Sequence, residues 1–229
     1  MTEAFTTLDL LAAGWFALAW LGYALVVEAT PLARRTLNAR MDAYRVVWMR
    51  RMAHREIRIV DANIMGTLQN GSAFFASTSL IALGGALSYL RSPEEALRLF
   101  SALPFASPTS ALAWEVKVMG LAVIFAYAFF KFAWSYRLMN YAAILIGATP
   151  DALADDEIDA SEMAGRAAAM NRLAGAHFNR GQRAFFFAVG YLGWFLGPTL
   201  FAVATASVLL VMARRQFGWT SLEALEGKI

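Results

Sequence analysis

The sequence contains no cysteine and only two histidines in 229 residues. The absence of cysteine excludes disulfide bonds, thiolate metal sites, cysteine nucleophiles and thiolate-ligated iron–sulfur clusters. Charge is also scarce, because charged residues make up 16% of the chain whereas apolar residues make up 59%. The charges are confined to a few intervals, which is typical of a protein that crosses a membrane several times rather than of a soluble domain.

Long apolar stretches separate these charged intervals. Each is about twenty residues long or longer, which is enough to cross a hydrocarbon core ~30 Å thick. The first stretch follows an acidic leader with Glu3 and Asp9 and has no clear cleavage site, so we expect it to remain as a span. We predict an all-α polytopic membrane protein with four transmembrane helices and additional cytoplasmic amphipathic or connecting helices. It forms one integral-membrane domain over residues 1–229, with spans at 8–27, 64–90, 114–146 and 184–212 and cytoplasmic segments at 28–63 and 147–183.

Basic residues predict the orientation of these spans. Twelve arginines lie in the two long connecting segments, and five basic residues lie on the opposite side. Positive charge marks cytoplasmic loops, so we expect both termini to face outward, N-out and C-out. The pair Arg214–Arg215, directly after the fourth span, opposes this assignment. The excess of arginine over lysine and the abundance of alanine favour a bacterium with a GC-rich genome, and hence its inner membrane.

The segment from Arg40 to Asp61 lacks proline and glycine and carries an apolar stripe at helical spacing. Arginines flank this stripe. We therefore expect an interfacial helix whose arginines meet anionic lipid headgroups while its apolar face enters the acyl boundary. Packing of the same face beneath the helical bundle is the alternative. The stripe consists of Met41, Tyr44, Trp48 and Met52.

Small residues predict where helices approach one another closely. Gly84 and Ser88 lie near the outer end of the second span, and Gly193 and Gly197 form a GxxxG pair just ahead of an expected kink at Pro198. Such faces serve packing between membrane helices, and we expect them to join subunits of a homo-oligomer.

No enzyme motif of high specificity is present. The chain has no P-loop, GxSxG, HExxH or dinucleotide fingerprint, so we expect no catalytic residues. His54 and His177 could ligate a haem, but they come from two different segments. The acidic cluster lacks the glycine and terminal glutamate of an EF-hand loop, so solvated charge at a helix start is the simpler interpretation. It comprises Asp155, Asp156, Glu157 and Asp159. We expect no cofactor and no bound metal.

Basic residues in the third span admit two interpretations. Lys117, next to Glu115, could bind an ion or form a gate, but residues this close to Trp114 more often anchor a helix end. Lys131 and Arg137 could line a pore or bind phosphate, whereas snorkelling towards the cytoplasmic interface is the simpler expectation.

One run of the third span resembles a known family. Residues 129–137 read Phe-Phe-Lys-Phe-Ala-Trp-Ser-Tyr-Arg, and Asn140–Tyr141 and the Ile-Gly-Ala-Thr-Pro of 146–150 follow. This pattern resembles the uncharacterised membrane family called domain-of-unknown-function family 599, DUF599. Stretches within 48–61, 74–79 and 178–198 agree with it, whereas Lys131 departs from it. The resemblance implies a four-span integral membrane protein and no catalytic residue or substrate that can be carried over.

The resemblance also draws attention to polar residues near the predicted cytoplasmic boundary. Buried polar groups need partners, and this set contains both signs of charge. We hypothesise that it forms a polar layer that joins the spans where they emerge. Its members are Arg58, Asp61, Trp134, Ser135, Arg137, Asn140, Asn171, Asn179 and Arg183.

These observations favour a non-enzymatic inner-membrane protein, either a homo-oligomeric scaffold or a small channel-like assembly. The alternatives are an accessory subunit of a larger membrane complex and a redox subunit that binds haem or a metal. The expected partners are the lipid bilayer, through anionic headgroups at the basic cytoplasmic face, and further copies of the chain, with other membrane subunits as a further option. The arginine-rich segment is explained by topology, so we expect no nucleic acid.

Overall fold

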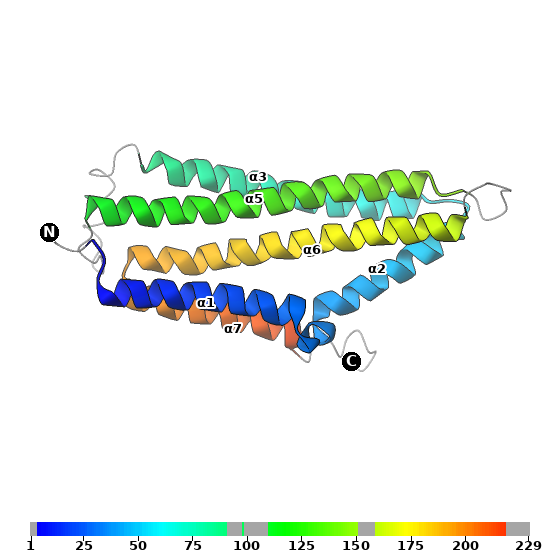
Figure 1. Ribbon diagram of the computed structural model, residues 1–229. Coiled ribbons are helices and arrows are strands. Elements are labelled where there is room, and N and C mark those ends of the chain that lie inside the picture. The colour runs from blue at the N-terminus through cyan, green and yellow to red at the C-terminus, as the bar shows by residue number, and fades with distance from the viewer. Residues whose placement is uncertain (1–3, 91–97, 99–109, 151–158, 219–229) are drawn as a thin grey trace. The chain divides into compact units, whose positions relative to one another are not determined.

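The structure is a computed structural model that describes residues 4–90, 98, 110–150 and 159–218 (Figure 1). The described residues form α-helices and short 3-10 helices and contain no strand, which confirms the all-α fold class. In chain order the elements are α1 (Thr7–Ala29), η1 (Pro31–Arg35), α2 (Leu37–Ala53), α3 (Ile59–Ser88), α5 (Ala111–Gly147), α6 (Ala160–Leu192), η2 (Gly193–Phe195) and α7 (Pro198–Phe217).

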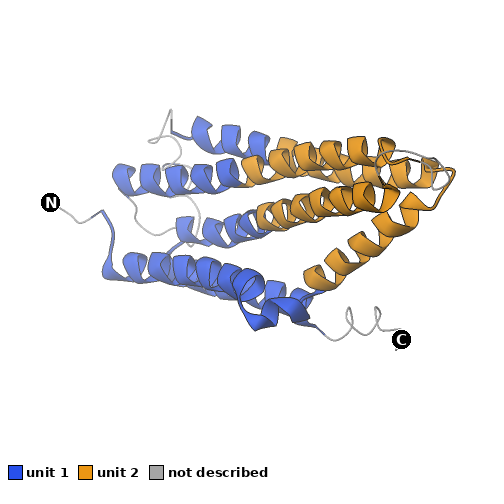
Figure 2. Ribbon diagram, turned by 45° about the vertical axis from the view of Figure 1, so that its right-hand side comes forward, with its two compact units in different colours: residues 1–37, 79–127, 183–229 blue, residues 38–78, 128–182 orange. Residues whose placement is uncertain are grey.

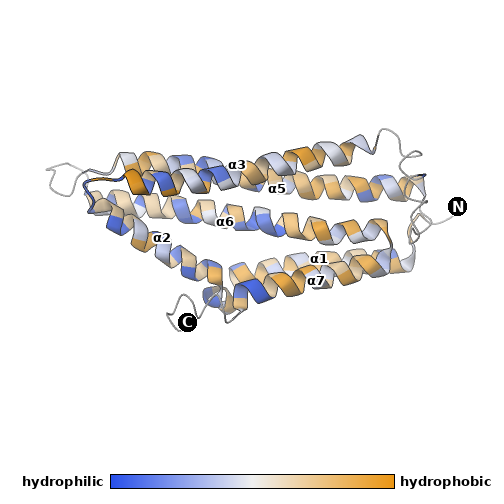
Figure 3. Ribbon diagram, turned by 180° about the vertical axis from the view of Figure 1, so that it is seen from behind, coloured by the Kyte–Doolittle hydropathy of each residue, from blue (hydrophilic) through white to orange (hydrophobic). Residues whose placement is uncertain are grey.

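Four of these helices, α1, α3, α5 and α7, are long and apolar enough to cross a membrane. Their outer faces carry large apolar side chains without a protein cover, and Leu18 and Ile81 are 72% and 75% exposed. Apolar residues dominate α1 and α7 except at the end of α7, where hydrophilic residues lie (Figure 3). Such a surface is costly in water and suited to acyl chains, so the chain is a polytopic membrane protein.

Helix α1 begins at a reciprocal capping box. The Thr6 hydroxyl accepts a hydrogen bond from the Asp9 amide at 3.2 Å, and the Asp9 carboxylate accepts one from the Thr6 amide at 3.0 Å. Both donors belong to the first turn, where no intrahelical acceptor exists. Asp9, which the sequence analysis placed in an acidic leader, is therefore part of the start of α1.

The chain forms two compact units (Figure 2). Unit 1 comprises residues 1–37, 79–127 and 183–229, and unit 2 comprises residues 38–78 and 128–182. Helices α1 and α7 belong to unit 1 and α2 to unit 2, while α3, α5 and α6 each contribute one part to either unit.

The core of unit 1 is aromatic. Phe16 of α1 lies 5.6 Å, between ring centroids, from Phe187 of α6 and 5.2 Å from Phe201 of α7. Trp194 of η2 stacks on Phe201 at 5.0 Å, with an angle of 12° between the planes. These rings bury large areas and hold three segments that are distant in sequence together.

The segment predicted as one kinked span over residues 184–212 is instead a reversal of the chain. Helix α6 ends at Leu192, η2 follows, and α7 begins at Pro198. Gly197 has a φ of 143°, a conformation that side chains disfavour, and Pro198 suits the first turn of a helix. A Cβ on Gly193 would lie 3.0 Å from the Leu200 carbonyl oxygen. The GxxxG pair thus serves this turn within unit 1.

Helices α1 and α7 run parallel. The Trp15 indole donates to the Ala202 carbonyl, and two turns later the Tyr23 hydroxyl donates to the Met212 carbonyl, each at 3.2 Å. Two parallel crossings place their starts on one face of a membrane and their ends on the other. The N-out, C-out orientation stays a prediction, and the parallel course of α1 and α7 after the reversal that follows α6 bears on it.

The core of unit 2 is rich in methionine. Met49 and Met52 of α2 are fully buried with Met65 of α3 and Met139 of α5. The apolar stripe expected on α2 is thus divided, because Met52 packs in this core whereas Met41 and Tyr44 are 44% and 50% exposed.

Asp159 lies at the start of α6, as expected for charge at a helix start. Its carboxylate accepts a hydrogen bond from the Ser161 amide at 2.9 Å.

Candidate functional site

Asp61 lies at the centre of a buried polar cluster in unit 2. Its Oδ1 accepts hydrogen bonds from the Trp48 indole and from the Arg55 guanidinium, each at 2.6 Å. Asp61 is fully buried in the first turn of α3, and Arg55 reaches it from the segment after α2. The acid therefore ties the end of α2 to the start of α3, and its charge is compensated locally.

Arg58 closes the end of α5. Its guanidinium donates to the Thr149 carbonyl and, at 2.8 Å, to the Pro150 carbonyl. The last carbonyls of a helix lack intrahelical partners, and a cation there is favourable. Thr149 and Pro150 follow α5, and the guanidinium also reaches the Ile146 carbonyl in the last turn of α5 at 3.4 Å, so Arg58 holds the end of α5 and the residues after it.

Arg45 joins α2 to α6. It donates to both the backbone carbonyl and the side-chain oxygen of Asn171, and its Nε lies 3.6 Å from Asp42. Burial lowers the pKa of Arg45 and raises the pKa of Asp42, although Arg45 and Arg172 act against the rise. A Cβ on Gly175 would lie 2.9 Å from the Arg45 guanidinium carbon, so the glycine makes room for this arginine.

Two further polar contacts connect α3 with α5 in unit 2. Gln69 donates to the Asn140 side chain at 2.8 Å. The Ser135 hydroxyl donates to the Ala174 carbonyl of α6 at 2.8 Å and lies 3.3 Å from the Ser72 hydroxyl. These contacts are small and mutually satisfied, which is how polar groups contribute to helix packing in a membrane protein.

The members of the predicted polar layer make their described contacts with residues outside the layer. The structure brings Asp61, Ser135, Asn140 and Asn171 into buried or half-buried contacts, but with Trp48, Arg55, Gln69 and Arg45, which the sequence analysis did not select.

Three members of the predicted layer stand apart from these contacts. Arg137 is exposed and donates to Tyr141, Trp134 is 47% exposed beside His177, and Asn179 is half-buried.

Arg183 belongs to unit 1 and pairs with an acid that the sequence analysis left out. Its guanidinium donates to the Glu28 carboxylate at the end of α1, and Arg183 is 6% exposed. The pair ties the end of α1 to α6, and Glu28, whose side chain is 35% exposed, supplies the counter-charge of the buried Arg183.

A second charged cluster lies at the other end of unit 1. Lys117 donates to the Trp194 carbonyl at 3.0 Å and lies 4.0 Å from Asp9, which accepts the Trp194 indole at 2.8 Å. Lys117 and Asp9 are 4% and 8% exposed. Lys117 therefore supports a backbone carbonyl at the turn between α6 and α7, in agreement with the interpretation that it anchors a helix end.

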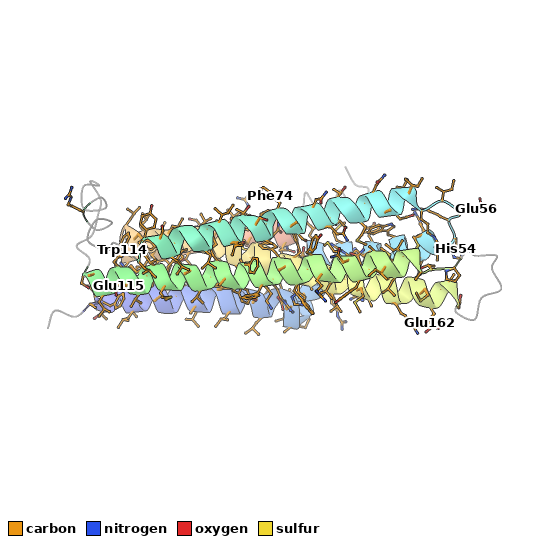
Figure 4. The ribbon with its side chains drawn as sticks, turned by 90° about the horizontal axis from the view of Figure 1, so that it is seen from above. His54, Glu56, Phe74, Trp114, Glu115 and Glu162 are labelled. Carbon is orange, nitrogen blue, oxygen red and sulfur yellow. The ribbon has the colours of Figure 1, made fainter. Side chains whose placement is uncertain are left out.

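The structure describes both histidines and only part of the acidic cluster that was considered as a ligand. Figure 4 shows His54 near Glu56, where Glu162 of α6 also lies. Among the described residues, no group of three or more His, Asp or Glu side chains could hold a metal. Asp155, Asp156 and Glu157 of the acidic cluster lie outside the described residues.

The fold and these contacts define the class of the protein as an all-α polytopic membrane protein with polar clusters between its helices. The chain belongs to the family described as "Protein of unknown function, DUF599", which matches residues 11–220. No curated protein and no solved structure matches the chain.

Proposed function

We propose that the protein is a non-enzymatic scaffold of the bacterial inner membrane that forms homo-oligomers through the end of α3. The observation that carries this proposal is an uncovered small-residue face at Gly84 and Gly85. A Cβ at either glycine would meet nothing within 4 Å. In membrane helices such faces allow a second helix to approach closely.

The surface next to Gly84 and Gly85 also favours this face as the contact between two copies of the chain. Next to Gly85 lies an apolar pocket of about 300 Å³, lined by Ala86, Trp114, Val118, Leu121 and Phe195 among others. Side chains from a second copy could fill this space and gain packing contacts that the isolated chain lacks. By contrast, Gly193 already packs against α7, so its face is occupied within the chain.

The proposed orientation is N-out and C-in. It treats α6, which ends at Leu192, as a fifth crossing helix. Arg183 of α6 pairs with Glu28 at the end of α1, and Trp194, just after α6, pairs with Asp9 at the start of α1, so α6 runs antiparallel to α1. Arg214, Arg215 and Lys228 then move to the inner side. Fifteen basic residues lie there, and two, Arg91 and Arg98, lie outside, a stronger bias than the N-out, C-out assignment allows.

The absence of cysteine provides a direct test of the oligomer. Ser88→Cys places one thiol beside Gly84 and Gly85, and Leu18→Cys places a matched thiol on an exposed face of α1. We expect oxidation in native membranes to give a disulfide dimer with Ser88→Cys and little with Leu18→Cys. Adding Gly84→Leu to Ser88→Cys should remove the dimer, because the larger side chain separates the helices.

Equal cross-linking at both positions, or none at Ser88→Cys, would contradict assembly through this face. Native mass spectrometry of gently extracted protein separates the remaining possibilities. A homo-oligomer supports the scaffold, whereas a complex with a different chain would assign the protein an accessory role in a larger assembly.

A further inference from the structure

Two arginine pairs that are distant in sequence lie at the same end of unit 1. Arg34 and Arg35 end η1, which packs on α1, and Arg214 and Arg215 stand in the last turn of α7. The hydrogen bond from the Tyr23 hydroxyl to the Met212 carbonyl holds these two helix ends together. From the sequence alone, the two pairs were expected on opposite faces of the membrane.

The four side chains are exposed, and none of them pairs with a carboxylate among the described residues. Arg183, at the same end, differs because Glu28 neutralises it. Arg215 additionally lies over the Phe186 ring, with its guanidinium carbon 5.3 Å from the centroid, which restricts its position without reducing its charge. The surface therefore carries four positive charges that the described part of the chain leaves uncompensated.

An exposed apolar surface adjoins these charges. One turn before Arg214 and Arg215, Leu210 and Val211 are 59% and 50% exposed, and Leu25 of α1 is 62% exposed. A ligand that matches both parts needs an anionic head and apolar chains. Guanidinium groups bind phosphate oxygens through paired hydrogen bonds, and basic sites between membrane helices suit lipid headgroups.

We propose that Arg34, Arg35, Arg214 and Arg215 form a binding site for the phosphate headgroup of an anionic phospholipid, whose acyl chains lie along Leu25 and Leu210. The site requires α1 and α7 to be parallel membrane spans. It does not require oligomerisation, so a failed cross-linking test at Ser88→Cys leaves it unaffected.

The test measures lipid retained by the full-length protein in nanodiscs of phosphatidylglycerol and phosphatidylcholine. Native mass spectrometry after gentle release counts the phosphatidylglycerol molecules that stay bound. We expect Arg214→Gln/Arg215→Gln and Arg34→Gln/Arg35→Gln each to weaken retention by roughly tenfold or more, since each arginine near an anionic headgroup contributes about 1 kcal/mol. Lysine at the same positions should retain most of the binding.

Arg50→Gln/Arg51→Gln is the matched control. It removes the same charge from an exposed pair in the last turn of α2, so it also reproduces the loss of a favourable helix-dipole interaction. Because these arginines stand on the helix expected to meet anionic headgroups, the control also measures general charge attraction, and we expect it to lose distinctly less phosphatidylglycerol than either pair in unit 1. An equal loss in the control would overturn the local site in favour of a general charge effect.

Inorganic phosphate distinguishes a lipid site from a site for small anions. We expect millimolar phosphate at constant ionic strength to leave phosphatidylglycerol bound, because the acyl chains contribute to affinity. Displacement by phosphate would overturn the lipid assignment. A changed size-exclusion profile would show that a variant has not folded correctly. In that case the other double glutamine variant decides the outcome, since η1 and α7 are separate elements.

Discussion

The Trp194 indole donates a hydrogen bond of 2.8 Å to the Asp9 carboxylate and thereby joins the first turn of α1 to the turn between α6 and α7. Lys117 completes this junction by donating to the Trp194 carbonyl. The three residues come from three helical segments of unit 1, so the junction fixes the same end of all three.

Replacing Asp9 should destabilise the protein strongly. Asp9→Asn leaves Lys117 buried without its counter-charge, and breaking such a pair costs about 3 kcal/mol. Thermal unfolding in a mild detergent should therefore shift to lower temperature. The double variant Asp9→Asn/Lys117→Met removes both charges and should recover part of the loss. If the double variant is less stable than Asp9→Asn alone, the ion pair is not the cause.

The parallel course of α1 and α7 predicts the location of the C-terminus. Green fluorescent protein fused after Ile229 should fluoresce, and alkaline phosphatase fused there should be inactive, because this end lies in the cytoplasm in the proposed orientation. A phosphatase fused between α3 and α5 should be active and serves as the control. An active phosphatase at the C-terminus would refute the crossing by the end of α6.

Gly120 should tolerate no larger residue unless Tyr191 changes as well. A Cβ at Gly120 would lie 2.1 Å from the Tyr191 hydroxyl oxygen, so Gly120→Ala displaces that side chain within a packed core. We expect a loss of about 1–3 kcal/mol in unfolding free energy, as for other overpacked cores.

Tyr191→Phe, which removes the clashing oxygen, should restore part of the stability lost in Gly120→Ala. Gly22→Ala is the control, since nothing lies within 4 Å of a Cβ there. Equal losses in the two alanine variants would point to a backbone effect common to both glycines.

Asp42 predicts a stability difference that depends on pH. Burial raises the pKa of its carboxyl group, so the folded state holds the proton more tightly than the unfolded chain. This tighter binding of the proton stabilises the folded state at pH values below the ordinary Asp pKa, about 3.9. The stabilisation is lost as the pH rises through the raised pKa of Asp42. Asp42→Asn should therefore match the wild type at low pH and exceed its stability at neutral pH.

The difference in unfolding free energy between the wild type and Asp42→Asn is measured from low to neutral pH. Glu162→Gln is the comparison, because Glu162 forms an exposed pair with Arg166 at 2.5 Å that should contribute little. A gap for Asp42→Asn that narrows as pH rises would contradict the role of burial.

Helix positions could be predicted closely from composition, and helix directions could not. The third span was expected over residues 114–146, and α5 covers Ala111–Gly147, since a long apolar run bounded by proline leaves few alternatives. A GxxxG pair followed by Pro198 is compatible both with a kinked helix and with a reversal of the chain, so the local sequence does not distinguish the two. The contacts of Trp194 with Asp9 and Lys117 decide between them, and the positions of Arg214 and Arg215 were the one sequence signal of the reversal.

The candidate polar residues were identified by type but not by partner. Arg183 pairs with Glu28, 155 positions away, and Asp61 with Trp48 and Arg55 close in sequence. Periodicity places a side chain on a helix face, whereas the choice of partner depends on how helices pack. The exposed position of Arg137 agrees with the expectation of a snorkelling side chain, but its inclusion in a buried polar layer does not.

The hydrogen bond between Trp194 and Asp9 spans 185 positions, so the start of the first helix is completed by a residue that is synthesised much later than Asp9. Until the ribosome has produced the turn after α6, Asp9 and Lys117 stand in the nascent protein without the indole and carbonyl that complete their environment. A chain that ended before Trp194 would therefore lack the indole and the carbonyl that Asp9 and Lys117 use as partners.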